Sequence, residues 1–191
     1  MNAVKWQHNS KYWCFFAVFL FLSACQGPLY KVAPIPQASP IESGKFASNN
    51  VIEVTAAALL DDDQVFERFD ANLVLAGIIV VDINLVNRSS ESFNLKFEIH
   101  DADGKNFSQL ESKKSLDRVI KFEGVRAYSK LGKQETLEQL EATTVPKKIT
   151  LPAQQQKRGI LFFNAKRDAS QLRGLRLTVK GIKEPIQLLL N

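Results

Sequence analysis

Cysteine is nearly absent from this chain of 191 residues, in which the two cysteines are Cys14 and Cys25. Because no cysteine follows Cys25, the rest of the chain can form neither an internal disulfide nor a thiolate metal site. Any domain in that part must be held together by its apolar core alone.

Histidine and tryptophan are also scarce. Trp6, Trp13 and His8 all precede Cys25, so His100 is the only histidine after it. A zinc site or a catalytic pair needs partner side chains for an imidazole, and no second histidine or thiol supplies one. We therefore expect His100 to be a surface residue at the end of a strand. We expect no catalytic residue, no metal site and no cofactor.

No apolar run has the length of a membrane-spanning helix. The stretch from Tyr12 to Leu22 is about half of the roughly 20 residues that such a helix needs. Lys5 and Lys11 supply positive charge before it, and the small residues Ser23 and Ala24 follow it. This order is typical of an export signal, and we predict that residues 1–24 are a signal peptide.

The four residues Leu22-Ser23-Ala24-Cys25 resemble the lipobox of bacterial lipoproteins. The resemblance implies cleavage between Ala24 and Cys25, with Cys25 becoming the lipid-bearing first residue. The alternative is a plain secretory signal with an incidental cysteine. Gln26 rather than aspartate follows the cysteine, which in Gram-negative lipoprotein sorting implies the outer membrane, facing the periplasm.

Charge of one sign is not concentrated in the sequence. The net charge of +5 falls to +3 once residues 1–24 are removed, because Lys5 and Lys11 are lost together with no acid. Nucleic-acid-binding proteins usually carry a concentrated basic face. We therefore expect no nucleic-acid partner.

Proline punctuates the region after Cys25, at Pro28, Pro34, Pro36 and Pro40. No helical or strand period survives between these residues. We predict that residues 25–50 are a lipidated cysteine followed by a Pro-rich tether, with the folded domain over 51–191. A disordered leader without a tuned length is the alternative.

Alternating apolar positions dominate the folded part and indicate β-strands. We expect strands at 51–57, 77–87, 93–99, 147–151, 159–164, 175–182 and 185–190. Strands 77–87 and 93–99 are expected to form an antiparallel pair, because their link is too short for a parallel crossover.

Helical patterns interrupt the strands twice. Asp61 or Asp62 is expected to cap a short helix that places Val65, Phe66 and Phe69 on one face. A helical insertion is expected over about 108–144, with breaks at Gly124 and Gly132.

Two longer stretches resemble the immunoglobulin-like domains of uncharacterised bacterial lipoproteins. They are "FERFDANLVLAGIIVVDINLVNRSSESFNLKFEIHDADGK" and "ITLPAQQQKRGILFFN". The shared features are a strand that ends at Asn87 before a polar turn, the turn at 101–104, and the element at 151–163. The resemblance implies a mainly β fold: an immunoglobulin-like antiparallel β-sandwich with a short N-terminal helix and a helical insertion. It brings no catalytic residues with it.

Acidic residues gather at two places. Asp101-Ala102-Asp103-Gly104 does not fit the EF-hand calcium loop, since Lys105 occupies position 5, and a hairpin turn is expected instead. The run 61–63 is expected to be a helix-capping cluster.

These observations predict a membrane-anchored periplasmic lipoprotein that acts as a non-enzymatic binding or scaffold module of the bacterial cell envelope. Its partners would be the membrane, through the N-terminal lipid, and an unidentified envelope protein or cell-wall component. The alternative is a metal-assisted hydrolase using Asp61, Asp62, Asp63, Asp101 and Asp103.

Overall fold

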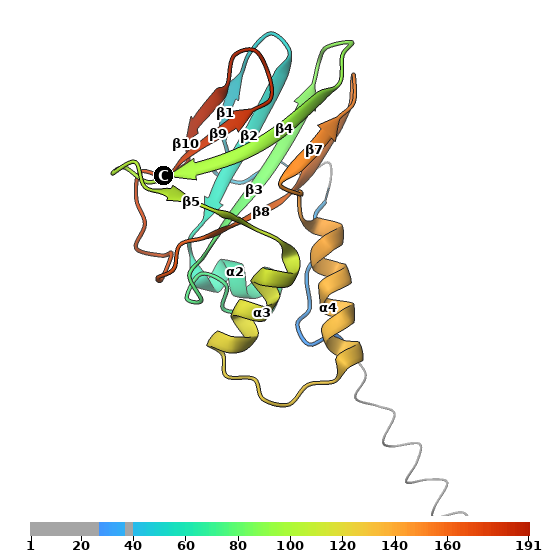
Figure 1. Cartoon of the computed structure of the whole chain (residues 1–191), viewed down its shortest axis with the longest axis vertical. Coiled ribbons are helices and arrows are strands. Elements are labelled where there is room, and N and C mark those ends of the chain that lie inside the picture. Colours follow the sequence, from blue (N-terminus) through green and yellow to red (C-terminus); the bar gives the residue numbers. More distant parts are fainter. Residues whose placement is uncertain (1–26, 37–39) are drawn as a thin grey trace, which may run out of the picture.

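The computed structural model describes residues 27–36 and 40–191. The predicted signal peptide and Cys25 lie outside this range. The described residues form two antiparallel β-sheets, with helices gathered at one end of the strands (Figure 1). No helix in the described part of the chain is long and apolar enough to cross a membrane.

The first sheet has five strands in the order β1-β2-β3-β8-β6. They are β1 (Lys45–Ser48), β2 (Ile52–Leu59), β3 (Ile78–Asn87), β8 (Gln156–Asn164) and β6 (Gln109–Leu110). The central strand β3 is buried along most of its length because α2 and the N-terminal residues cover the face that carries Asp82.

The second sheet is built around β4 (Phe93–His100). One edge of β4 pairs with β9, while the other pairs with β5 and β7. The remaining strands are β5 (Asn106–Phe107), β7 (Lys148–Leu151), β9 (Arg176–Lys180) and β10 (Ile186–Leu189). In β4, Leu95, Phe97 and Ile99 are buried while Asn94 and Lys96 are exposed, as the alternation predicted.

Both sheets contribute to one hydrophobic core, for example through Ile83 and Leu85 of β3 and Leu95 and Ile99 of β4. The prediction of a mainly β, antiparallel fold with a short helix and a helical insertion is confirmed at this level.

The predicted pairing of β3 with β4 is wrong. Strand β3 pairs with β2 and β8, so β3 and β4 belong to different sheets. The amide of Asn87, a residue only 1% exposed, donates to the carbonyls of Glu91 at 2.7 Å and Pro152 at 2.8 Å. These bonds fix a connection that crosses from one sheet to the other instead of closing a hairpin.

The three helices of the described chain are α2 (Asp62–Phe69), α3 (Ser112–Phe122) and α4 (Lys130–Thr143). Asp61 caps α2 by accepting from Gln64 N at 2.9 Å, as predicted. Phe66 is 44% exposed, so the expected apolar face of α2 contains only Val65 and Phe69. Gly132 lies inside α4 and does not break it.

The predicted tether also differs from the structure. Residues 27–36 pack on the helices, and β1 pairs with β2, so the folded body includes parts of the region assigned to a tether. The prolines are compatible with this packing because they lie outside the run of N–H groups that bond to the helices.

Candidate functional site

Residues 27–36, called here the N-terminal segment, run alongside α4 (Figure 1). Leu29 N donates to Gly132 O at 2.9 Å, and Tyr30 N donates to Thr136 Oγ1 at 2.9 Å. One turn further, Val32 N donates to Gln139 Oε1 at 3.0 Å. Positions 132, 136 and 139 share one face of a helix, so the segment follows that face.

The segment then passes from α4 to α2 and the first sheet. Ala33 N donates to Arg68 O at 2.8 Å, and Pro36 O accepts from Arg158 Nη1 at 3.0 Å. Pro28 and Pro34, which have no N–H to satisfy, flank the bonded run. The backbone of the segment is therefore held by residues that are remote in the sequence.

Tyr30 is the main side-chain anchor of the segment. It is 7% exposed, and its hydroxyl donates to Glu123 Oε2 at 2.6 Å. The other oxygen of Glu123 accepts from Asn72 N and Asn72 Nδ2, both at 2.9 Å. Burial and, after it, the bond to Glu123 raise the pKa of Tyr30 above its ordinary value of 10.0. The phenol thus stays protonated and remains a donor at neutral pH.

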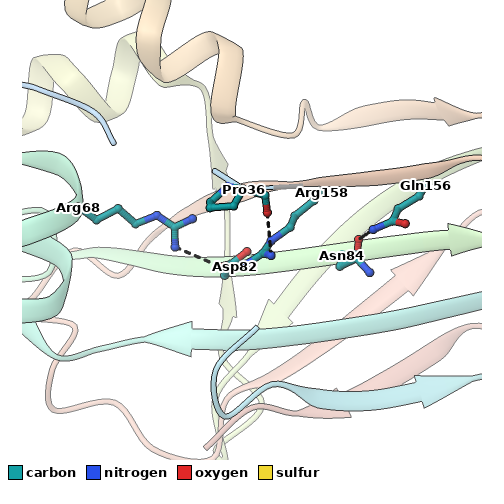
Figure 2. A network of polar contacts seen from close by, with 6 residues as sticks. All are labelled: Pro36, Arg68, Asp82, Asn84, Gln156 and Arg158. Carbon is teal, nitrogen blue, oxygen red and sulfur yellow. Dashed lines mark hydrogen bonds and ion pairs between the residues drawn. The ribbon is translucent and has the colours of Figure 1, made fainter. Parts of the chain in front are cut away.

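A buried ionic cluster lies under the end of the segment. Figure 2 shows Arg68 and Arg158 converging on Asp82, with Pro36 beside Arg158. Asp82 Oδ2 is 3.0 Å from Arg68 Nη1 and 3.2 Å from Arg158 Nη2. The side chains of Asp82 and Arg158 are each 5% exposed. The cluster joins β3, β8 and α2, and through Pro36 it also holds the segment.

A cavity of about 370 Å³ opens beside this cluster and is lined in part by Arg68, Asp82 and Arg158. Both arginines of the cluster are already directed at the Asp82 carboxylate. The arrangement is suited to holding the segment against the first sheet.

A second site lies on the outer face of the second sheet. It is a groove of about 420 Å³ that brings His100 and Asp101 together with Arg176, which lies across from them on β9. Glu98 pairs with Lys180 at 2.6 Å, and His100 Nε2 lies 3.8 Å from the same carboxylate. The groove therefore presents mixed charge, suited to polar binding.

The turn after β4 is the hairpin turn that the sequence predicted. Asp101 Oδ1 accepts from Asp103 N at 3.1 Å and from Lys105 N at 2.9 Å. Gly104 adopts φ 78°, a left-handed conformation that glycine takes without strain. The Asp101 carboxylate is thus used to hold the turn.

The acids proposed for a metal-assisted hydrolase are not brought together. Asp61, Asp62 and Asp63 lie at the start of α2, whereas Asp101 and Asp103 lie in the turn between β4 and β5. Over residues 27–36 and 40–191, no group of three or more His, Cys, Asp or Glu side chains is placed to hold a metal ion.

Sequence reasoning missed the residues that hold the N-terminal segment. Asp82 interrupts the apolar run "IIVVDI", and an acid inside a strand buried on both faces signals a buried ion pair. Tyr30 gave a weaker signal, as a large aromatic residue in a stretch otherwise rich in proline and polar residues.

No family model matches the chain, and no curated protein matches it. Among solved structures, the crystal structure of the yjhA protein from Bacillus subtilis is similar at a TM-score of 0.42 and 7% sequence identity. The match covers 77% of this chain and 96% of that one.

Proposed function

We propose that this chain is a membrane-anchored lipoprotein of the bacterial envelope whose β-sheet body is a non-enzymatic binding or scaffold module. Signal cleavage after Ala24 leaves Cys25 as the lipid-bearing first residue. The support for this anchor is the sequence "FLFLSACQG", in which a lipobox-like motif directly follows a short apolar run.

The observation that carries the proposal is the docked N-terminal segment. Ordering a backbone costs about 1–2 kcal/mol per residue, and here the bonds to α4 and the burial of Tyr30 offset that cost. A leader that does not position the body relative to the membrane needs no such contacts. A segment that links an anchor to a body benefits from them, because they hold the body in one place relative to the lipid.

The body itself is proposed to be an immunoglobulin-like sandwich on the outer membrane, facing the periplasm. Its two antiparallel sheets support the first part, and Gln26 after the cysteine supports the second. The mixed-charge groove over β4 and β9 is the surface that we assign to an envelope protein or cell-wall component.

Two cysteine variants of the full chain test the anchor. Cys25→Ser is expected to abolish metabolic labelling with palmitate, because the lipid-bearing sulfur is removed. Cys14→Ser is the matched control, since Cys14 lies within the predicted signal peptide, and it should keep the label. Retention of the lipid label in Cys25→Ser would show that the anchor is assigned wrongly.

A further inference from the structure

Exposed apolar side chains gather where α3 is joined to α4. Phe122 is 51% exposed, Tyr128 41% and Leu131 49%. They belong to residues 121–133, called here the hairpin tip, which contains the end of α3, the connection and the first turn of α4. The other large apolar residues that are exposed in the described chain lie on three different elements, and they are Phe46, Phe66 and Leu189. The hairpin tip is thus a local concentration of exposed apolar surface.

The same stretch is basic. It contains Lys121, Arg126, Lys130 and Lys133 against one acid, Glu123, which gives a net charge of +3. The Glu123 carboxylate is occupied by Tyr30 and Asn72. Lys133 is paired with Asp117, whereas Lys121, Arg126 and Lys130 are exposed. Aromatic and aliphatic side chains among lysine and arginine are typical of surfaces that lie in a membrane interface.

The start of the described chain lies beside this tip (Figure 1). Leu29 is bonded to Gly132 in the first turns of α4, and a Cβ added to Gly132 would lie 2.6 Å from Gly27 O. Cys25 is two residues before Gly27. Two peptide units span at most about 7 Å, so a lipid on Cys25 has to enter the membrane close to the tip.

We propose that the hairpin tip is a second membrane contact beside the lipidated cysteine. Phe122, Tyr128 and Leu131 insert at the boundary between headgroups and acyl chains, while Lys121, Arg126 and Lys130 contact anionic headgroups. The inference rests on the proposed function, because the lipid on Cys25 is what brings the tip to the bilayer. The second contact prevents the body from pivoting about a single point.

Tryptophan fluorescence tests this contact in the lipidated protein. Both natural tryptophans, Trp6 and Trp13, precede Cys25 and are lost on cleavage. Tyr128→Trp therefore places a single probe at the tip. Phe46→Trp is the matched control, because Phe46 is 63% exposed on β1, at the edge of the first sheet and away from the helices (Figure 1).

Each variant, expressed as the full chain and purified as the mature protein, is reconstituted into vesicles of phosphatidylethanolamine and phosphatidylglycerol with brominated acyl chains. We expect the emission of Tyr128→Trp to be blue-shifted and quenched several-fold relative to vesicles without bromine. The emission of Phe46→Trp should stay unshifted and unquenched. Adding Lys121→Glu and Lys130→Glu to Tyr128→Trp should reduce the quenching, with circular dichroism confirming that the fold is kept.

The different failures are distinguishable. A Tyr128→Trp protein that is lipidated by mass spectrometry but shows no quenching overturns the second contact and leaves the anchor intact. A mature protein without lipid overturns the anchor and this inference with it. If the tip probe is accessible to acrylamide in vesicles but protected in intact envelopes, a protein partner covers the tip, and the membrane contact is again overturned.

Discussion

At the scale of single residues, Asp82 of β3 links its strand to two other elements. One carboxylate oxygen pairs with Arg68 of α2 and Arg158 of β8, and Arg158 in turn holds Pro36. A buried ion pair gives little net stability when it is complete, but removal of one partner leaves an uncompensated charge in the interior.

Asp82→Asn is therefore expected to lower the free energy of unfolding by about 3–5 kcal/mol. The change keeps the shape of the side chain and removes the charge that the two arginines share. The urea midpoint measures the loss. Glu53→Gln is the control, since Glu53 pairs with Arg88 at 2.9 Å on the surface, where ion pairs contribute little. Similar losses in the two variants would contradict a special role for the buried cluster.

Tyr30 makes the free energy of unfolding depend on pH in the alkaline range. Its pKa is raised in the folded state, so the folded state holds the phenolic proton more tightly than the unfolded chain. The resulting stability is complete below the ordinary pKa of 10.0 and is lost as the pH rises above it. Unfolding free energies measured on either side of pH 10.0 should fall more steeply in the native protein than in Tyr30→Phe.

Tyr128→Phe serves as the comparison for this measurement, because Tyr128 is 41% exposed. This variant should keep the steep fall of the native protein. At neutral pH, Tyr30→Phe alone should lose about 1–3 kcal/mol, since it leaves Glu123 Oε2 without its donor. A native-like pH profile for Tyr30→Phe would show that the phenol does not control this dependence.

At the scale of elements, the clearest partnership is between the N-terminal segment and α4. Thr136 is 1% exposed, and its hydroxyl accepts from Tyr30 N. Thr136→Val keeps the volume and removes the acceptor. Amide exchange of Tyr30 should become roughly fivefold faster or more, which corresponds to about 1 kcal/mol of lost protection.

Thr143→Val is the matched change on the same helix. The hydroxyl of Thr143 donates to two carbonyls of α4, at 3.0 and 3.3 Å. Its loss should leave exchange in the segment unchanged. Equal acceleration in both variants would mean that the segment responds to the stability of α4 as a whole and not to its own bond.

Element types were accessible from the sequence, whereas element partners were not. Alternation in "FNLKFEI" predicted β4, and the acid before "VFERF" predicted the cap of α2, since both signals are local. The partner of β3 was missed because a five-residue link suits a hairpin as well as a crossing between sheets. The pairings of β3 with β2 and β8, together with the bond from Asn87 to Pro152, hold the crossing, and all of these partners except β2 lie far along the chain.

The candidate site was less predictable than the fold for the same reason. His100 was expected at the end of a strand and lies at the end of β4, in the groove on the second sheet. The residues that hold the N-terminal segment form a site only through contacts between distant parts of the chain, such as the bond from Val32 to Gln139. Proline, by contrast, is a strong local signal, and it favoured a tether.

At the scale of the whole molecule, the docked segment imposes an order in time. A chain is made from its N-terminus, so residues 27–36 emerge long before α4. The partner of Tyr30 N lies 106 positions later, and that of Val32 N lies 107 positions later. Contacts of such separation cost more loop-closure entropy than local contacts do. The first part of the domain to be synthesised can therefore dock only after α4 has formed, so docking of the segment reports on the formation of that helix.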